Sequence, residues 1–286
     1  MDTLRLGFAR AEVMLDPGTG FLATPDGTDR FSGIEVFEFT DGRLVLDADD
    51  PAAQVMRLYR VALDRLSDDV GLAHWTWAVS GGVGLASVAG GFLDSTEFVT
   101  RFGALDDAGF AALLSAHIHA PDLALDIQDM LAAGLSRAAV LAEVVGGWAA
   151  RRATAADLAA GVWDQHAIAE TVAILYHLAL GRSPEAGGWA YWTGLWAGGM
   201  SAEAVASGVL HSAEFQARHG TPDAAGLVPL LLRETLGHTP SDAEAAPWLE
   251  AVRAGLDAPG LLLAMAEATA LTAHFVPVME SGLLFA

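Results

Sequence analysis

Two stretches decide the fold, LYRVALDR at residues 58–65 and LYHLALGR at residues 175–182. Shifting the chain by 117 residues places segment 58–103 over segment 175–220 without a gap, and about 20 of the 46 positions are identical. Self-similarity at one fixed shift over such a length indicates a true internal repeat. This duplicated unit therefore determines the organisation of most of the chain.

The repeated unit has the pattern of a helix. Asp50-Pro51 is typical of a helix start, and apolar residues then recur at helical spacing from Val55 to Leu63. A weaker echo follows each copy, at residues 110–151 and 227–270. Each echo contains a helix, an Ala-Gly turn and a further helix, and the two align after an insertion of about four residues. The sequence therefore predicts a mainly α fold, a duplicated helical repeat with two pseudo-equivalent halves and four units.

The N-terminal segment differs from this pattern. Residues 34–39 alternate between apolar and acidic, and Asp41-Gly42 separates them from a second apolar run, which is a strong hairpin signal. We predict a small β element of two to four strands. The expected organisation is a β element at 1–48, a first helical half at 50–152, a second at 153–270 and a C-terminal tail at 271–286.

Composition excludes several classes of function. The 286 residues include 36 acidic and 15 basic side chains, all of the latter arginine, and the formal net charge is −21. Such a charge repels phosphate, which argues against binding to nucleic acid and to anionic membranes. The absence of cysteine excludes disulfides, thiolate catalysis and cysteine-ligated metals. The longest apolar stretches, 79–93 and 261–271, are too short or too interrupted to insert in a membrane.

Both copies can be written Leu-Tyr-x2-Ala-Leu-x-Arg-x5-Gly-x3-Trp, then Gly-Gly, then Ser-x-Glu-Phe-x2-Arg-x-Gly. This motif resembles the DUF4214 repeat, an all-helical module of bacterial surface-layer, adhesin and hemolysin-like proteins. Copy 2 follows the family pattern closely. Copy 1 departs from it at Leu66-Ser67, where the family has proline, and at His74, where tyrosine is usual.

Residues 27–42 are similar to a strand pair that precedes this module in RTX-type proteins, which bind calcium and leave the cell by type I secretion. The resemblance implies an extracellular or cell-surface location, reached by that route or by incorporation in a phage-like particle. The glycine-rich nonapeptide calcium repeats of those relatives do not occur in this sequence.

Candidate binding residues are the aromatics that differ between the copies. Tyr59, Arg65, Trp75 and Glu97 recur in both halves, which favours a structural role and an Arg65–Glu97 ion pair. The non-repeated aromatics are better candidates for a sugar platform, because an exposed ring can stack on a sugar while nearby carboxylates accept its hydroxyl hydrogens. They are Trp77, Trp189, Tyr191 and Trp196. The alternative is that this aromatic stripe belongs to the core.

Calcium is the one metal that the sequence suggests. Asp47, Asp49 and Asp50 are rich in oxygen, which calcium prefers, although helix capping explains the same residues. We identify no catalytic motif.

We therefore expect a non-enzymatic surface protein that binds bacterial polysaccharide, either lipopolysaccharide O-antigen or capsule. It would act as a surface-layer-type anchor or as a spike or fibre component of a phage-like particle. One alternative is a structural adaptor that binds protein subunits in an extracellular or virion-like assembly. A polysaccharide-cleaving enzyme is a weaker one.

Overall fold

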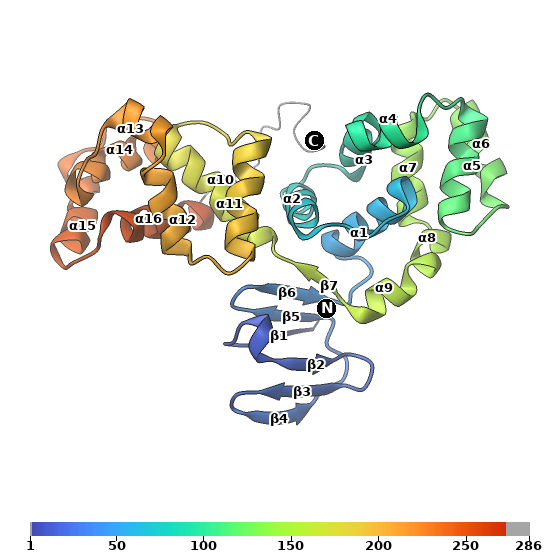
Figure 1. The fold of residues 1–286 in the computed structure, drawn as a ribbon, viewed down its shortest axis with the longest axis horizontal. Coiled ribbons are helices and arrows are strands. Elements are labelled where there is room, and N and C mark those ends of the chain that lie inside the picture. Colours follow the sequence, from blue (N-terminus) through green and yellow to red (C-terminus); the bar gives the residue numbers. More distant parts are fainter. Residues whose placement is uncertain (1, 273–286) are drawn as a thin grey trace. The chain divides into compact units, whose positions relative to one another are not determined.

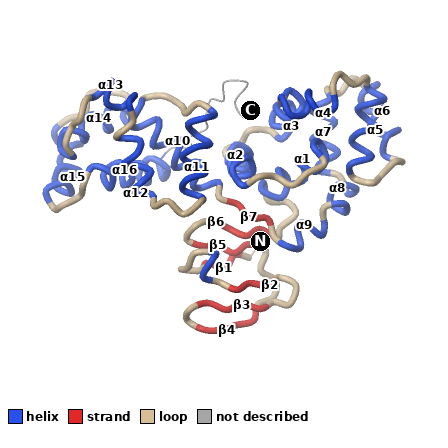
Figure 2. Tube along the Cα trace, viewed as in Figure 1, coloured by secondary structure: helices blue, strands red, loops and turns tan. Residues whose placement is uncertain are grey.

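The structure is a computed structural model that describes residues 2–272. The described chain forms two units that divide after His166. The first unit contains both strands and helices, and the second is helical (Figures 1 and 2). The strands are β1 (Thr3–Arg5), β2 (Met14–Asp16), β3 (Phe21–Thr24), β4 (Gly27–Arg30), β5 (Val36–Phe39), β6 (Gly42–Val45) and β7 (Val162–Asp164).

Several helices of the first unit begin at a residue whose side chain caps the helix. Asp50 caps α1, Asp68 caps α2, Ser95 caps α4 and Asp106 caps α5, each by accepting a backbone N–H with its side chain. These helices are α1 (Pro51–Leu63), α2 (Asp69–Ser80), α3 (Leu85–Asp94), α4 (Thr96–Phe102), α5 (Asp107–His117), α6 (Leu123–Ala132), α7 (Arg137–Gly146), α8 (Trp148–Ala153) and α9 (Ala155–Ala160).

The second unit repeats the order of the first seven helices. Its helices are α10 (His166–Leu180), α11 (Ala186–Ala197), α12 (Ala202–Leu210), α13 (Ala213–His219), α14 (Ala224–Leu236), α15 (Asp242–Arg253) and α16 (Ala258–Thr272). The predicted mainly α, duplicated fold is thus confirmed. In the first unit α3 packs on α7, and in the second α12 packs on α16, so each weak unit belongs to the same body as the strong unit before it.

The strands form two sheets in the first unit, gathered at one end of its helices (Figure 2). One sheet has the order β2-β3-β4, and the other has the order β1-β5-β6-β7. Their shared core contains Val13, Leu22, Phe37, Phe39 and Leu44. The predicted hairpin is present, with Phe39 paired to Gly42.

The boundary between the two halves lies later in the chain than predicted, because of strand β7. We placed the boundary between the halves at residues 152 and 153, which falls inside α8, whereas Val162–Asp164 completes the N-terminal sheet by pairing antiparallel with β6. The β element is therefore not confined to residues 1–48. Of the expected tail, residues 273–286 lie outside the described chain.

A cluster around Arg43 joins β6, β7 and the start of α1. Arg43 Nε donates to Asp164 Oδ2 at 2.7 Å, and its two Nη atoms donate to the carboxylate of Asp50 at 2.8 and 2.9 Å. His166 Nδ1 lies 2.7 Å from Asp164 Oδ2. Burial works to lower the pKa of Arg43, but the carboxylates of Asp164 and Asp50 outweigh it, and the pKa lies above its ordinary value.

Candidate functional site

The repeated charged residues have the same structural role in both units. Arg65 makes a two-pronged pair with Glu97, with both distances at 2.8 Å, and Arg182 makes the equivalent pair with Glu214 at 2.6 Å. The expected ion pair is thus present twice. Hydrogen bonding from Arg65 holds the pKa of Glu97 below its usual range, which indicates that the pair stabilises the folded state.

The repeated tyrosines and glycines are equally structural. A Cβ built at Gly71 would collide with the hydroxyl of Tyr59, and one built at Gly188 would collide with that of Tyr176. Tyr59 is only 1% exposed. Glycine therefore recurs because the tyrosine ring lies directly against the helix that follows. Since the repeat is explained by packing, residues specific to one copy are the better place to look for a site.

For two of the four aromatic residues, the predicted role in sugar binding is wrong. Trp77 is 4% exposed and Trp189 is 3% exposed, so neither ring can meet a ligand. Trp189 Nε1 donates to the carbonyl of Ala169 at 3.2 Å, which fixes the ring against α10. Both side chains belong to the core, as the alternative interpretation held.

The other two reach solvent in different directions. Tyr191 is 59% exposed and Trp196 is partly buried. They are five residues apart on α11, which turns one side chain about 140° from the other around the helix axis. They therefore cannot present one platform to one sugar.

The predicted calcium ligands are engaged by arginines and by the backbone. Asp50 caps α1 and pairs with Arg43, while Asp49 Oδ1 lies 2.5 Å from Arg151 Nη2. Asp47 Oδ1 accepts the backbone N–H of Asp49 at 2.8 Å. A cation placed among them would have to displace these positive partners. In residues 2–272 no group of three or more histidine or acidic side chains is arranged to hold a metal ion. The structure thus favours capping over calcium binding.

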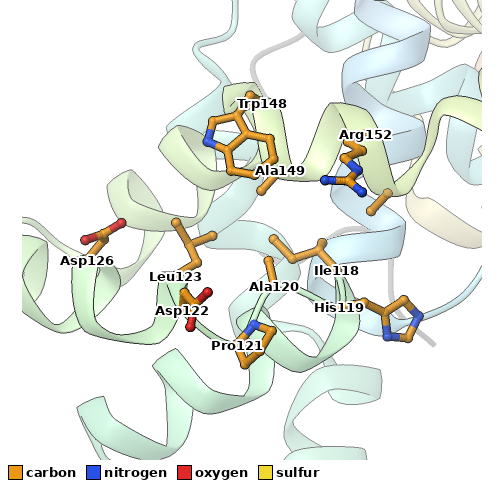
Figure 3. Close-up of a pocket in the computed structure, with 11 residues that line it drawn as sticks. Ile118, His119, Ala120, Pro121, Asp122, Leu123, Asp126, Trp148, Ala149 and Arg152 are labelled. Carbon is orange, nitrogen blue, oxygen red and sulfur yellow. The ribbon is translucent and has the colours of Figure 1, made fainter.

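A groove in the first unit contains an aromatic side chain that the sequence analysis missed. It has a volume of about 440 Å³ and lies between α8 and the turn that joins α5 to α6 (Figure 3). Trp148 stands at its rim and is 71% exposed. The groove is lined by Ile118, His119, Ala120, Pro121, Asp122, Leu123, Asp126, Trp148, Ala149, Arg152 and Ala153.

Helix α8 positions two of these side chains on one face. Ala149 and Ala150 are buried and anchor the helix, whereas Trp148 and Arg152 are exposed. Residues four apart in a helix are neighbours on its surface. Trp148 and Arg152 therefore line the same side of the groove, at successive turns, as Figure 3 shows.

The opposite side is a tight turn followed by the first turn of α6. His119 adopts a left-handed backbone with φ of 52°, and the N–H of Ala120 bonds to the carbonyl of Ser115 at 2.9 Å. The left-handed residue and this hydrogen bond together reverse the direction of the chain before Pro121. Asp122 and Asp126 then follow four residues apart, and both carboxylates are exposed. They face the groove with their acceptor oxygens open to solvent.

The break between α7 and α8 that positions Trp148 has no counterpart in the described part of the second unit, up to residue 272. Helix α7 ends at Gly146 and α8 begins at Trp148, whereas the equivalent α16 runs without a break from Ala258 to Thr272. Matching the starts of α7 and α16 places the buried Thr269 at the position of Trp148. A comparison of the weak units for aromatics specific to one copy would have identified Trp148 from the sequence.

Comparison with known proteins agrees with the repeat. The sequence model of a family described as a domain of unknown function, DUF4214, matches residues 49–102 and 163–219. These ranges contain α1 to α4 and α10 to α13, the helices of the two strong copies. No curated protein and no solved structure is significantly similar to the chain. Within the described residues, no helix is both long and apolar enough to cross a membrane.

Proposed function

We propose that this DUF4214-domain protein, which carries two copies of the domain, binds the glycan chains of a bacterial surface polysaccharide without cleaving them. Its place would be extracellular, at a cell surface or on a phage-like particle. The observation that carries the proposal is the exposed Trp148 at the rim of a groove with polar side chains. The resemblance to surface-layer and adhesin modules supports the same class of ligand.

The chemistry of the groove suits a sugar. The faces of a pyranose ring present C–H groups that pack on an aromatic ring, and its hydroxyls need acceptors around the edge. Trp148 supplies the ring, and Asp122 and Asp126 supply open carboxylate oxygens across the groove. A purely apolar partner would leave these two charges desolvated and unpaired, which is costly.

The same geometry argues against cleavage. Glycosidases place two carboxyl groups on either side of the scissile bond, one to protonate the leaving oxygen and one to attack or activate water. Asp122 and Asp126 both come from the start of α6 and stand on the same side of the groove (Figure 3). We therefore assign them a binding role.

The test is titration of the full chain with purified O-antigen and capsular polysaccharides, both acidic and neutral, by isothermal calorimetry and tryptophan fluorescence. If a sugar covers about 80–100 Å² of the Trp148 ring, burial at about 25 cal/mol per Å² contributes about 2–2.5 kcal/mol. Trp148→Ala should then weaken binding about 30–70-fold. Because Trp148 is exposed, circular dichroism should show an unchanged fold.

Tyr191→Ala is the matched control, since it removes another exposed aromatic from the second unit. It should leave glycan affinity unchanged, and EDTA should have no effect because arginines already hold Asp49 and Asp50. Loss of binding in Tyr191→Ala but not in Trp148→Ala would refute the assignment to this groove. The absence of saturable binding to any polysaccharide would refute the function.

A structural adaptor is the second candidate, and strand β4 favours it. All four residues of Gly27–Arg30 are exposed, and β4 is an outer strand of its sheet. An uncovered strand edge can pair with a strand from another protein. This role predicts that the glycan titrations give no signal, whereas sedimentation of the full chain with a partner subunit shows a complex.

A further inference from the structure

The groove has an uneven distribution of charge. Arg152 lies toward one end, and Asp126 lies toward the other, with Trp148 above the space between them (Figure 3). A neutral sugar would need only hydroxyl partners along this length. The guanidinium at the other end therefore favours a ligand that also carries an anionic group.

Arg152 is unusual in this chain because its guanidinium lies open in the groove. Within residues 2–272 it forms no ion pair or hydrogen bond with another side chain or with the backbone. The preceding residue, Arg151, is paired with Asp49 at 2.5 Å and also donates to the carbonyl of Gly146 at 3.1 Å. In a chain with a net charge of −21, carboxylates are abundant, so an arginine without one is available for an external anion.

From these observations, and resting on the proposed glycan-binding function, we propose that the groove selects a sugar that carries a carboxylate. The sugar ring stacks on Trp148, and its carboxylate receives two parallel hydrogen bonds from Arg152. The two side chains are one helical turn apart, about 6 Å along the axis, so a single ring on Trp148 brings a ring substituent within reach of the guanidinium.

A carboxylate suits the site better than a phosphate monoester. The planar guanidinium fork matches the two oxygens of a carboxylate. A carboxylate also carries a single charge, which one guanidinium neutralises. A phosphate of higher charge would meet stronger repulsion from Asp122 and Asp126, which line the same groove. The net charge of −21 also works against binding any polyanion by charge alone, so an acidic oligomer must gain its affinity from the stacked sugar ring and its paired carboxylate.

The test compares oligomers of glucuronate, galacturonate and mannuronate with their methyl esters, which keep the shape and remove the charge. We expect at least one acidic oligomer to bind the full-length wild-type chain about tenfold or more tightly than its ester, as charge-assisted hydrogen bonds do. Arg152→Gln should reduce the affinity for that acid to the level of the ester and leave the affinity for the ester unchanged. Arg152→Lys should restore part of the difference.

Arg151→Gln is the control, because it removes the adjacent arginine, which does not line the groove. It should preserve the preference for the acid. Equal binding of acid and ester, tighter binding of a sulfated than of a carboxylated oligomer, or an equal effect of Arg152→Gln on acid and ester would each overturn the inference. If neutral polysaccharide binds through Trp148 while Arg152→Gln changes nothing, only this inference fails. If no glycan binds, the proposed function fails with it.

Discussion

Replacing Arg43 with glutamine is expected to destabilise the first unit by about 3–5 kcal/mol, which is the usual effect of removing one partner from a buried ion pair. The side chain of Arg43 is 17% exposed, and those of its partners Asp50 and Asp164 are 3% and 0% exposed. Glutamine can replace one hydrogen bond but not the charge. Two buried carboxylates would then remain without the guanidinium that they share.

The measurement is urea unfolding of the full chain, followed by circular dichroism and tryptophan fluorescence. With a slope of about 2 kcal/mol per molar urea, the expected loss moves the midpoint of the first unit down by about 1.5–2.5 M. Arg43→Lys keeps the charge and loses the two-pronged geometry, so its midpoint should lie between those of wild type and Arg43→Gln.

Arg5→Gln provides the matched control in the same sheet. Arg5 pairs with Glu38 at 2.7 Å, but its side chain is 85% exposed, and such surface pairs contribute less than about 1 kcal/mol. If Arg43→Gln costs no more than Arg5→Gln, the cluster does not hold β6, β7 and α1 together, and our account of the sheet is wrong.

Two further predictions concern the helical repeat. Gly71→Ala should cost about 1–3 kcal/mol, because the new Cβ would meet the buried hydroxyl of Tyr59, whereas Gly90→Ala in α3, whose Cβ would lie 3.7 Å from the nearest atom, should stabilise by about 0.5–1 kcal/mol. Urea unfolding of both variants gives opposite signs if the packing is correct. Burial lowers the pKa of His74 to about 3, so between about pH 6.5 and 3 only the unfolded chain binds this proton. The free energy of unfolding should therefore fall on acidification by up to about 1.4 kcal/mol per pH unit. His74→Phe should remove that slope, and an unchanged acid limb would contradict the burial of His74.

The helical scaffold could be predicted because its signals are local and occur twice. Asp50 followed by Pro51 predicts the start of α1, and in the structure the side chain of Asp50 caps that helix. The Arg65–Glu97 pair was predictable because both members recur at the same spacing. The match of α7 to α16 after a four-residue insertion follows from the weak echo in the same way.

The direction of the aromatic side chains could not be predicted, because α2 and α11 are apolar around most of their circumference. A helix without a polar face gives no indication of which side is buried, so Trp77 and Tyr191 look equally available in the sequence. Only the packing separates the first, at 4% exposed, from the second, at 59%.

Long-range partners were equally hidden from the sequence. Asp49 meets Arg151 across 102 positions, and Arg43 meets Asp164 across 121. Strand β7 is three residues long, too short for alternation to reveal it, and its pairing with β6 is the sole reason that it is a strand. The arginine partners of Asp49 and Asp50 explain why these residues form ion pairs instead of the predicted calcium site.

The late position of β7 has a consequence for synthesis on the ribosome. Val45 and Val162 are neighbours in the sheet, yet 116 residues are translated between them. At a translation rate of about 5–20 residues per second, one edge of β6 stays unpaired for about 6–23 s after β6 is synthesised. Helices α1 to α9 are made in that interval, so we expect them to assemble first. The sheet is then the last part of the unit to close, and a ribosome that stalls before residue 162 leaves a chain whose strand edge can pair with a neighbour's.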